Sequence, residues 1–99
     1  MKNLNLKDEY LKILTDIFSS YCPDAEIWAY GSRVNGDCHD ASDLDMVVKS
    51  FNDENCNIST LKELICNSNI PILTDILLFD DISKAMQNEI LKKYIVIYP

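Results

Sequence analysis

The chain has 99 residues and a mass of 11.3 kDa, so we expect one compact domain that spans residues 1–99. Nine Lys and Arg residues against sixteen Asp and Glu residues give a net charge of −7, and 47% of the residues are hydrophobic. This composition excludes a disordered chain, and the shortage of basic residues excludes direct binding to nucleic acid, which depends on Lys and Arg side chains that neutralise phosphates.

A helix and two strands are predicted in the first half of the chain. Apolar residues recur at helical spacing over Leu6–Tyr21, and Pro23 follows as a stop signal. The short aromatic segment Ala25–Tyr30 is typical of a strand, and it runs directly into Gly31. The segment Asp43–Val48 alternates polar and apolar residues, which predicts a second strand.

The next part of the chain predicts a second helix and a third strand. After a polar loop over residues 52–56, apolar residues recur at helical spacing over Ile58–Ile65. The polar cluster Asn67–Asn69 and Pro71 end this helix. The nearly continuous apolar run Ile72–Phe79 is typical of a strand that is covered on both faces.

A third helix and an apolar tail close the chain. Ile82, Met86 and Ile90 follow one another at steps of four residues, and Asp81 is the predicted N-cap of this helix. The tail Tyr94–Tyr98 leaves two interpretations open, a last strand of the sheet or a surface for a partner. The alternation of helices and strands predicts an α/β fold without repeats or a linker.

The sequence shows no targeting or membrane segment. Met1–Leu4 leads into charged residues without the apolar region of a signal peptide, and no run approaches the roughly 18 apolar residues of a membrane helix. We therefore expect a cytoplasmic protein whose cysteines are reduced thiols. None forms the C-x-x-C pair that favours a structural zinc ion. The four cysteines are Cys22, Cys38, Cys56 and Cys66.

The segment between the first two strands holds the candidate site. Gly31-Ser32 at the end of a strand offers backbone N–H groups and a hydroxyl that can cradle a phosphate, and Gly36 permits the chain to turn back. Asp43 and Asp45 are two residues apart on a strand, so their carboxylates project from the same face. Two such carboxylates repel each other unless a proton or a cation lies between them, and oxygen ligands favour Mg²⁺ or Mn²⁺.

A P-loop is an alternative interpretation, because Gly31 and Gly36 have half of its spacing. The two residues after Gly36 would then be Lys and Ser or Thr, but they are Asp37 and Cys38. A carboxylate in place of the lysine would repel the phosphates, so the P-loop interpretation is rejected.

Gly31-Ser32, ten intervening residues and Asp43-Leu44-Asp45 form the pattern G-S-x₁₀-D-x-D. With this pattern the chain resembles the DNA polymerase β-like nucleotidyltransferase superfamily. The fuller runs Tyr30–Gly36 and Ser42–Val48 are similar to those of the minimal nucleotidyltransferases, the single-domain members of that superfamily. The resemblance implies an α/β (α+β) fold, in which helices flank the small mixed sheet of a polymerase β-like palm.

The resemblance also implies the metal and nucleotide ligands. Asp43 and Asp45 would hold two Mg²⁺ ions that clamp ATP, and the family's third carboxylate, on a later strand, corresponds to Asp75. Asp75 would share the second metal or take the proton of the attacking hydroxyl. It interrupts an apolar run, where an ionised side chain is costly unless something binds it. The residues expected to hold the phosphates are Gly31, Ser32 and Arg33.

Family members that act as antitoxins transfer AMP from ATP to a tyrosine of a HEPN-domain ribonuclease toxin, so the resemblance implies a protein adenylyltransferase with such a partner. An alternative is a non-catalytic antitoxin that neutralises its partner by occlusion. Transfer to a small molecule is less favoured, because no second domain is expected to form an acceptor pocket. Many relatives have a basic residue where this chain has Asn35, so either triphosphate binding is weaker here or the missing charge comes from a lysine or from the partner.

Overall fold

A computed structural model describes residues 6–31 and 44–99 of the chain. Its helices and strands follow the predicted order, with the first helix beginning two residues later than expected. The elements are α1 (Asp8–Tyr21), β1 (Glu26–Tyr30), β2 (Leu44–Ser50), α3 (Ile58–Cys66), β3 (Thr74–Leu78), a one-turn 3₁₀ helix (Phe79–Asp81), α4 (Lys84–Lys92) and β4 (Ile95–Tyr98).

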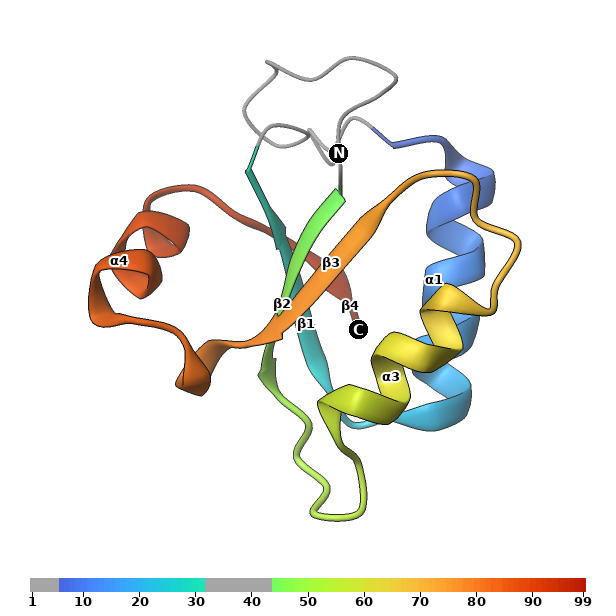
Figure 1. Ribbon diagram of the computed structural model, residues 1–99, viewed down its shortest axis with the longest axis horizontal. Coiled ribbons are helices and arrows are strands. Elements are labelled where there is room, and N and C mark those ends of the chain that lie inside the picture. The colour runs from blue at the N-terminus through green and yellow to red at the C-terminus, as the bar shows by residue number, and fades with distance from the viewer. Residues whose placement is uncertain (1–5, 32–43) are drawn as a thin grey trace.

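The strands form one mixed four-stranded sheet in the order β3-β2-β1-β4. β1 pairs antiparallel with both β2 and β4, whereas β2 and β3 are parallel and are connected through α3. Helices α1 and α3 cover one face of the sheet, and α4 lies on the other face (Figure 1). The predicted class, a small mixed sheet with flanking helices, is confirmed.

The alternation of side chains along the strands divides the core between the two faces of the sheet. On the α4 face, Trp28 and Val47 pack against Ile90, and the Trp28 ring stacks on the Tyr94 ring at a centroid distance of 4.0 Å. The face below α1 and α3 carries the larger cluster. Its fully buried members include Leu14, Phe18, Ile27, Leu44, Met46, Val48 and Leu61.

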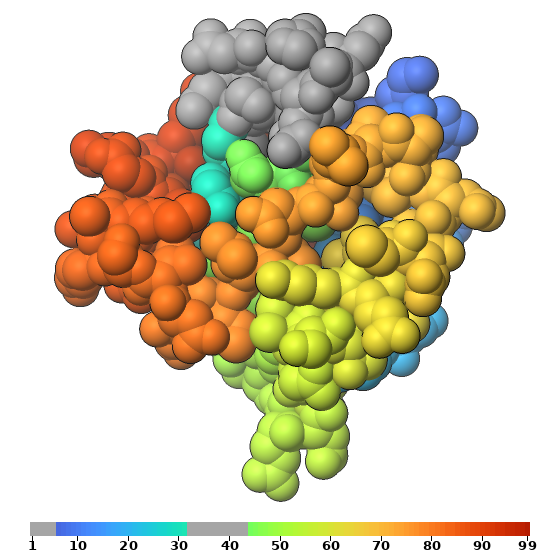
Figure 2. Space-filling view, in the orientation of Figure 1, coloured from blue at the N-terminus to red at the C-terminus, as the bar shows by residue number. Residues whose placement is uncertain are grey.

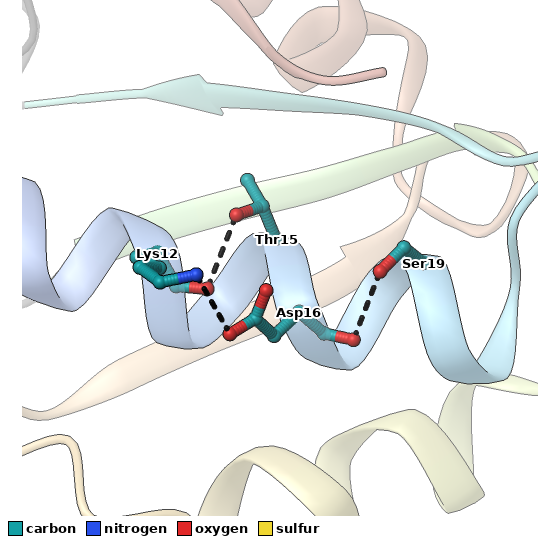
Figure 3. Close-up of polar contacts among 4 residues, drawn as sticks. All are labelled: Lys12, Thr15, Asp16 and Ser19. Carbon is teal, nitrogen blue, oxygen red and sulfur yellow. Dashed lines mark hydrogen bonds and ion pairs between the residues drawn. The ribbon is translucent and has the colours of Figure 1, made fainter.

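The outer side of α1 is polar, as its apolar spacing predicts. Lys12 and Asp16 form an exposed ion pair at 3.5 Å (Figure 3). The Thr15 hydroxyl donates a hydrogen bond to the backbone carbonyl of Lys12, and the Ser19 hydroxyl donates to that of Asp16, both at 3.1 Å. These contacts leave the opposite side of α1 to pack on the sheet.

The structure corrects the prediction for β3 and decides between the two interpretations of the tail that forms β4. The run Ile72–Phe79 was expected to be covered on both faces, and this is wrong: on the edge strand β3, Ile76 is buried on one face, but Asp75 on the other face is exposed. Leu73, just before it, is 73% exposed. The tail Tyr94–Tyr98, for which two interpretations were open, supplies β4 on the other edge of the sheet.

The predicted N-cap of α4 is wrong by two residues. Asp81 belongs to the 3₁₀ turn, and Ser83 is the cap, with its hydroxyl accepting a hydrogen bond from the backbone N–H of Met86 at 3.2 Å. Asp80 and Asp81, which follow β3, belong to the 3₁₀ turn, so the helix starts later than the sequence pattern predicts.

The cysteines that the structure describes, Cys22, Cys56 and Cys66, are free thiols, and Cys38 lies outside the described residues. Burial, with a smaller effect of the nearby Cys56, raises the pKa of the Cys22 thiol to about 11. Within residues 6–31 and 44–99, no helix has the length and apolar character needed to cross a membrane.

Candidate active site

Three adjacent strands bring Tyr30, Asp45 and Asp75 into one row across the sheet. Tyr30 of β1 is the register partner of Asp45 of β2, and Asp45 is in turn the register partner of Asp75 of β3. Side chains that are paired across neighbouring strands project from the same face, and such strands lie about 4.8 Å apart. The two carboxylates are therefore close neighbours, although thirty residues separate them in the sequence.

This row lies on the α4 face of the sheet, beyond the apolar cluster that α4 covers. Trp28 and Val47 are two residues along their strands from Tyr30 and Asp45, and both pack in the cluster with α4. Asp45 and Tyr30 are half-buried, and Asp75 on the edge strand is exposed. In Figure 2 the end of β1, coloured teal, reaches the surface between α4 and β3. The row is thus open to solvent at its Asp75 end.

Gly31 follows directly after the row and is required there for two reasons. Its φ of +85° lies in the left-handed region, which side-chain-bearing residues rarely adopt. A Cβ atom at this position would also lie only 2.8 Å from the Asp45 carboxylate oxygen Oδ2. The absence of a side chain at Gly31 therefore lets the backbone pass close to the Asp45 carboxylate.

The surroundings of Tyr30 raise the pKa of its hydroxyl. Burial, followed by the negative charges of Asp45 and Asp75, raises the pKa of the Tyr30 hydroxyl to about 12. The Tyr30 side chain is therefore a neutral hydroxyl at physiological pH, beside two negative charges. This electrostatic setting favours the binding of a cation.

The donors in the row fit a hard divalent cation. Carboxylate oxygens are the ligands that Mg²⁺ and Mn²⁺ prefer, and Asp45 and Asp75 supply them from two adjacent strands. Among the described residues, no three His, Cys, Asp or Glu side chains form a complete metal site by themselves. The predicted set has a third member, Asp43, which lies outside those residues, as do Ser32 and Arg33.

A cavity of about 360 Å³ lies between the end of β1 and α4. In the sequence, Lys92 and Lys93 are an isolated basic pair, and nothing in their spacing connects them with Gly31. The fold brings these residues to one cavity because α4 packs on the same face as the carboxylates. The residues that line it are Tyr30, Gly31, Met86, Glu89, Ile90, Lys92 and Lys93.

Comparison with known proteins identifies the class to which this site belongs. The family described as "Poly(A) RNA polymerase, mitochondrial-like, central palm domain" matches residues 1–94. The chain is also 35% identical over 97 residues to "Probable protein adenylyltransferase MntA" from Haemophilus influenzae, a match that covers 95% of this chain and 83% of that protein. The chain belongs to the polymerase β-like nucleotidyltransferase family.

The membership confirms the resemblance drawn from the G-S-x₁₀-D-x-D pattern. In this nucleotidyltransferase, the described part of the pattern is Gly31 and Asp45. Asp75 lies outside the pattern, and the parallel pairing of β2 with β3 places it beside Asp45.

Proposed function

We propose that the protein is a Mg²⁺-dependent adenylyltransferase that transfers AMP from ATP to a tyrosine of a cognate HEPN-family ribonuclease toxin, and that it acts as the antitoxin of this pair in the cytoplasm. The observation that carries the proposal is the register pairing of Asp45 with Asp75 on the open face of the sheet. The name of the Haemophilus influenzae relative, a probable protein adenylyltransferase, supports AMP as the transferred group and a protein as the acceptor.

In this proposal Asp43, Asp45 and Asp75 hold two Mg²⁺ ions, and Gly31, Ser32 and Arg33 bind the phosphates of ATP. Bound Mg²⁺ supplies Lewis-acid stabilisation of the charge on the α-phosphate and on the leaving pyrophosphate. The acceptor oxygen forms a bond to the α-phosphorus as the bond from phosphorus to the pyrophosphate oxygen breaks. The carboxylate of Asp75 accepts the proton of the acceptor hydroxyl.

The exposure of Asp75 supports a macromolecular acceptor. Asp75 lies on an edge strand and is open to solvent, whereas Asp45 next to it is half-buried. A hydroxyl on the surface of another protein can reach an exposed carboxylate at a sheet edge, but it could not enter a closed pocket. The order Tyr30, Asp45, Asp75 therefore supports approach of the acceptor from the β3 side.

Neutralisation by occlusion is the second candidate. It is favoured by exposed apolar side chains near the end of the chain, because such residues suit contact with a partner. Leu91 is 50% exposed, Val96 39% and Tyr94 38%. An occluding antitoxin would need this surface and none of the carboxylates.

The test is transfer of label from ATP that carries a radioactive α-phosphate to the co-purified partner, in the presence of Mg²⁺. We expect the wild-type protein to label the partner, and Asp43→Ala and Asp45→Ala to abolish the labelling. Asp81→Ala is the matched control, because Asp81 is an exposed carboxylate in the 3₁₀ turn beyond β3.

The same experiment separates catalysis from occlusion. Labelling by Asp43→Ala and Asp45→Ala at the wild-type level would contradict the catalytic roles of both residues. If neither the wild-type protein nor the two variants label the partner, but all three inhibit its ribonuclease activity, occlusion is the function.

A further inference from the structure

Two lysines, Lys92 and Lys93, line the cavity beside Gly31. Lys92 is in the last turn of α4, and Lys93 follows as its C-cap residue. The Lys92 ammonium contacts the Glu89 carboxylate at 3.1 Å, so part of its charge is already balanced. No described residue forms an ion pair with Lys93. The cavity therefore has a net positive charge, in a protein whose net charge is −7.

The cavity and the carboxylate row meet at the end of β1. Tyr30 is the register partner of Asp45 and also lines the cavity, and Gly31 lines the cavity while its backbone passes close to the Asp45 carboxylate. A ligand that begins at Asp45 and extends past Gly31 would enter the cavity toward α4. One end of such a ligand would lie beside the negatively charged carboxylates, and its other end would lie beside the lysines of the cavity.

We propose that Lys92 and Lys93 bind the β- and γ-phosphates of the nucleotide, so that the cavity is the site of the leaving pyrophosphate. This inference rests on the proposed nucleotidyl transfer. A triphosphate has its reactive α-phosphate at one end, and the two remaining phosphates carry most of its negative charge. Lysine ammonium groups stabilise that charge and its increase as pyrophosphate leaves.

A purely structural role for these lysines makes a different prediction. Cations at the carboxyl end of a helix stabilise the helix through its dipole, and Lys92 and Lys93 occupy that end of α4. In that case their removal would lower the melting temperature without a selective loss of phosphate binding. The test must therefore compare ligands that differ only in their phosphates.

The experiment measures the binding of ATP, AMP and inorganic pyrophosphate by isothermal titration in the presence of Mg²⁺. For Lys92→Ala/Lys93→Ala we expect affinity for ATP and for pyrophosphate to fall by about tenfold, with affinity for AMP unchanged. The matched control is Lys12→Ala/Lys84→Ala, which removes the same charge from two exposed lysines outside the cavity. It should leave all three affinities at the wild-type level.

Two single variants sharpen the test. Lys93→Arg keeps the charge and should retain the affinity for pyrophosphate. Glu89→Gln removes the partner of Lys92, so it should strengthen pyrophosphate binding by a few-fold. A structural role at the end of the helix does not predict this gain.

Each outcome decides the proposal. An equal loss for AMP and ATP, an equal loss in the control variant, or no loss at all would overturn the pyrophosphate site. Wild-type protein that binds pyrophosphate through these lysines but transfers no AMP would retain the site and refute the proposed function. Wild-type protein that binds none of the three ligands would overturn both.

Discussion

At the scale of single residues, the candidate site depends on Gly31, which has no side chain, and on the neutral hydroxyl of Tyr30. Gly31 allows the backbone to pass the Asp45 carboxylate, and Tyr30 stays neutral beside it. The first feature follows from a contact distance, and the second from burial of the Tyr30 hydroxyl together with the negative charges of Asp45 and Asp75. Each can be tested by a single substitution.

Gly31→Ala should disturb the site and destabilise the fold. The new Cβ would meet the Asp45 oxygen Oδ2 at 2.8 Å, and φ at this residue is +85°. We expect the free energy of unfolding to fall by about 1–3 kcal/mol, because a non-glycine residue is strained at positive φ. Urea unfolding measures this change, with Ser59→Ala on the exposed side of α3 as the control. Equal stability of both variants would contradict the close approach.

Tyr30 should ionise well above the pH at which a tyrosine ordinarily does. Its folded-state pKa is about 12, against an ordinary value of about 10, so its neutral form contributes stability that is complete below pH 10 and is lost as the pH rises toward 12. Tyrosinate absorbance during alkaline titration measures this, and Tyr30→Phe should remove the phase near pH 12. Asp45→Asn should shift that phase to lower pH. A phase near pH 12 that keeps its full amplitude in Tyr30→Phe would refute the assignment.

At the scale of elements, α4 connects the core to the cavity. Its inner side packs Ile90 against Trp28 and Val47, and its carboxyl end, Lys92 and the C-cap residue Lys93, lines the cavity. The position of this helix depends on the residue that caps its start. The sequence predicts Asp81 as this cap, whereas the structure has Ser83.

Ser83→Ala should destabilise the protein by about 1 kcal/mol, because it removes the hydroxyl that accepts a hydrogen bond from the Met86 N–H. Asp81→Ala is the discriminating control, since Asp81 would be the costly position if the cap predicted from the sequence were right. Thermal unfolding of the two variants measures the difference. A larger loss in Asp81→Ala than in Ser83→Ala would contradict the cap seen in the structure.

The elements themselves were largely predictable from local patterns. The helical spacing over Ile58–Ile65 and the following polar cluster defined α3 within a residue of its observed end at Cys66. The exposure of β3 was not predictable, because an apolar run has the same appearance in an edge strand and in a central strand. Only the pairing of β1 with both β2 and β4 shows that β3 lies at the edge.

At the scale of the whole molecule, the sheet separates a face that carries the larger apolar core from a face that carries the candidate site. Helices α1 and α3 lie on one face and α4 on the other (Figure 1). The row of Tyr30, Asp45 and Asp75 is on the α4 face, beyond the apolar cluster that α4 covers. The G-S-x₁₀-D-x-D pattern located part of this site from the sequence because its residues are near one another along the chain. The register of Asp75 with Asp45 and the approach of Lys92 and Lys93 to Gly31 are tertiary features, and sequence spacing does not encode them.

The most direct test of the active site is the rate of AMP transfer to the partner by Asp75→Asn, compared with Asp80→Asn. Both substitutions neutralise an exposed carboxylate at or just after β3, but only Asp75 is paired with Asp45. We expect Asp75→Asn to slow transfer by at least about a hundredfold, because it removes a metal ligand and proton acceptor, and Asp80→Asn to retain the wild-type rate. Equal transfer rates for the two variants would contradict a catalytic site built on Asp45 and Asp75.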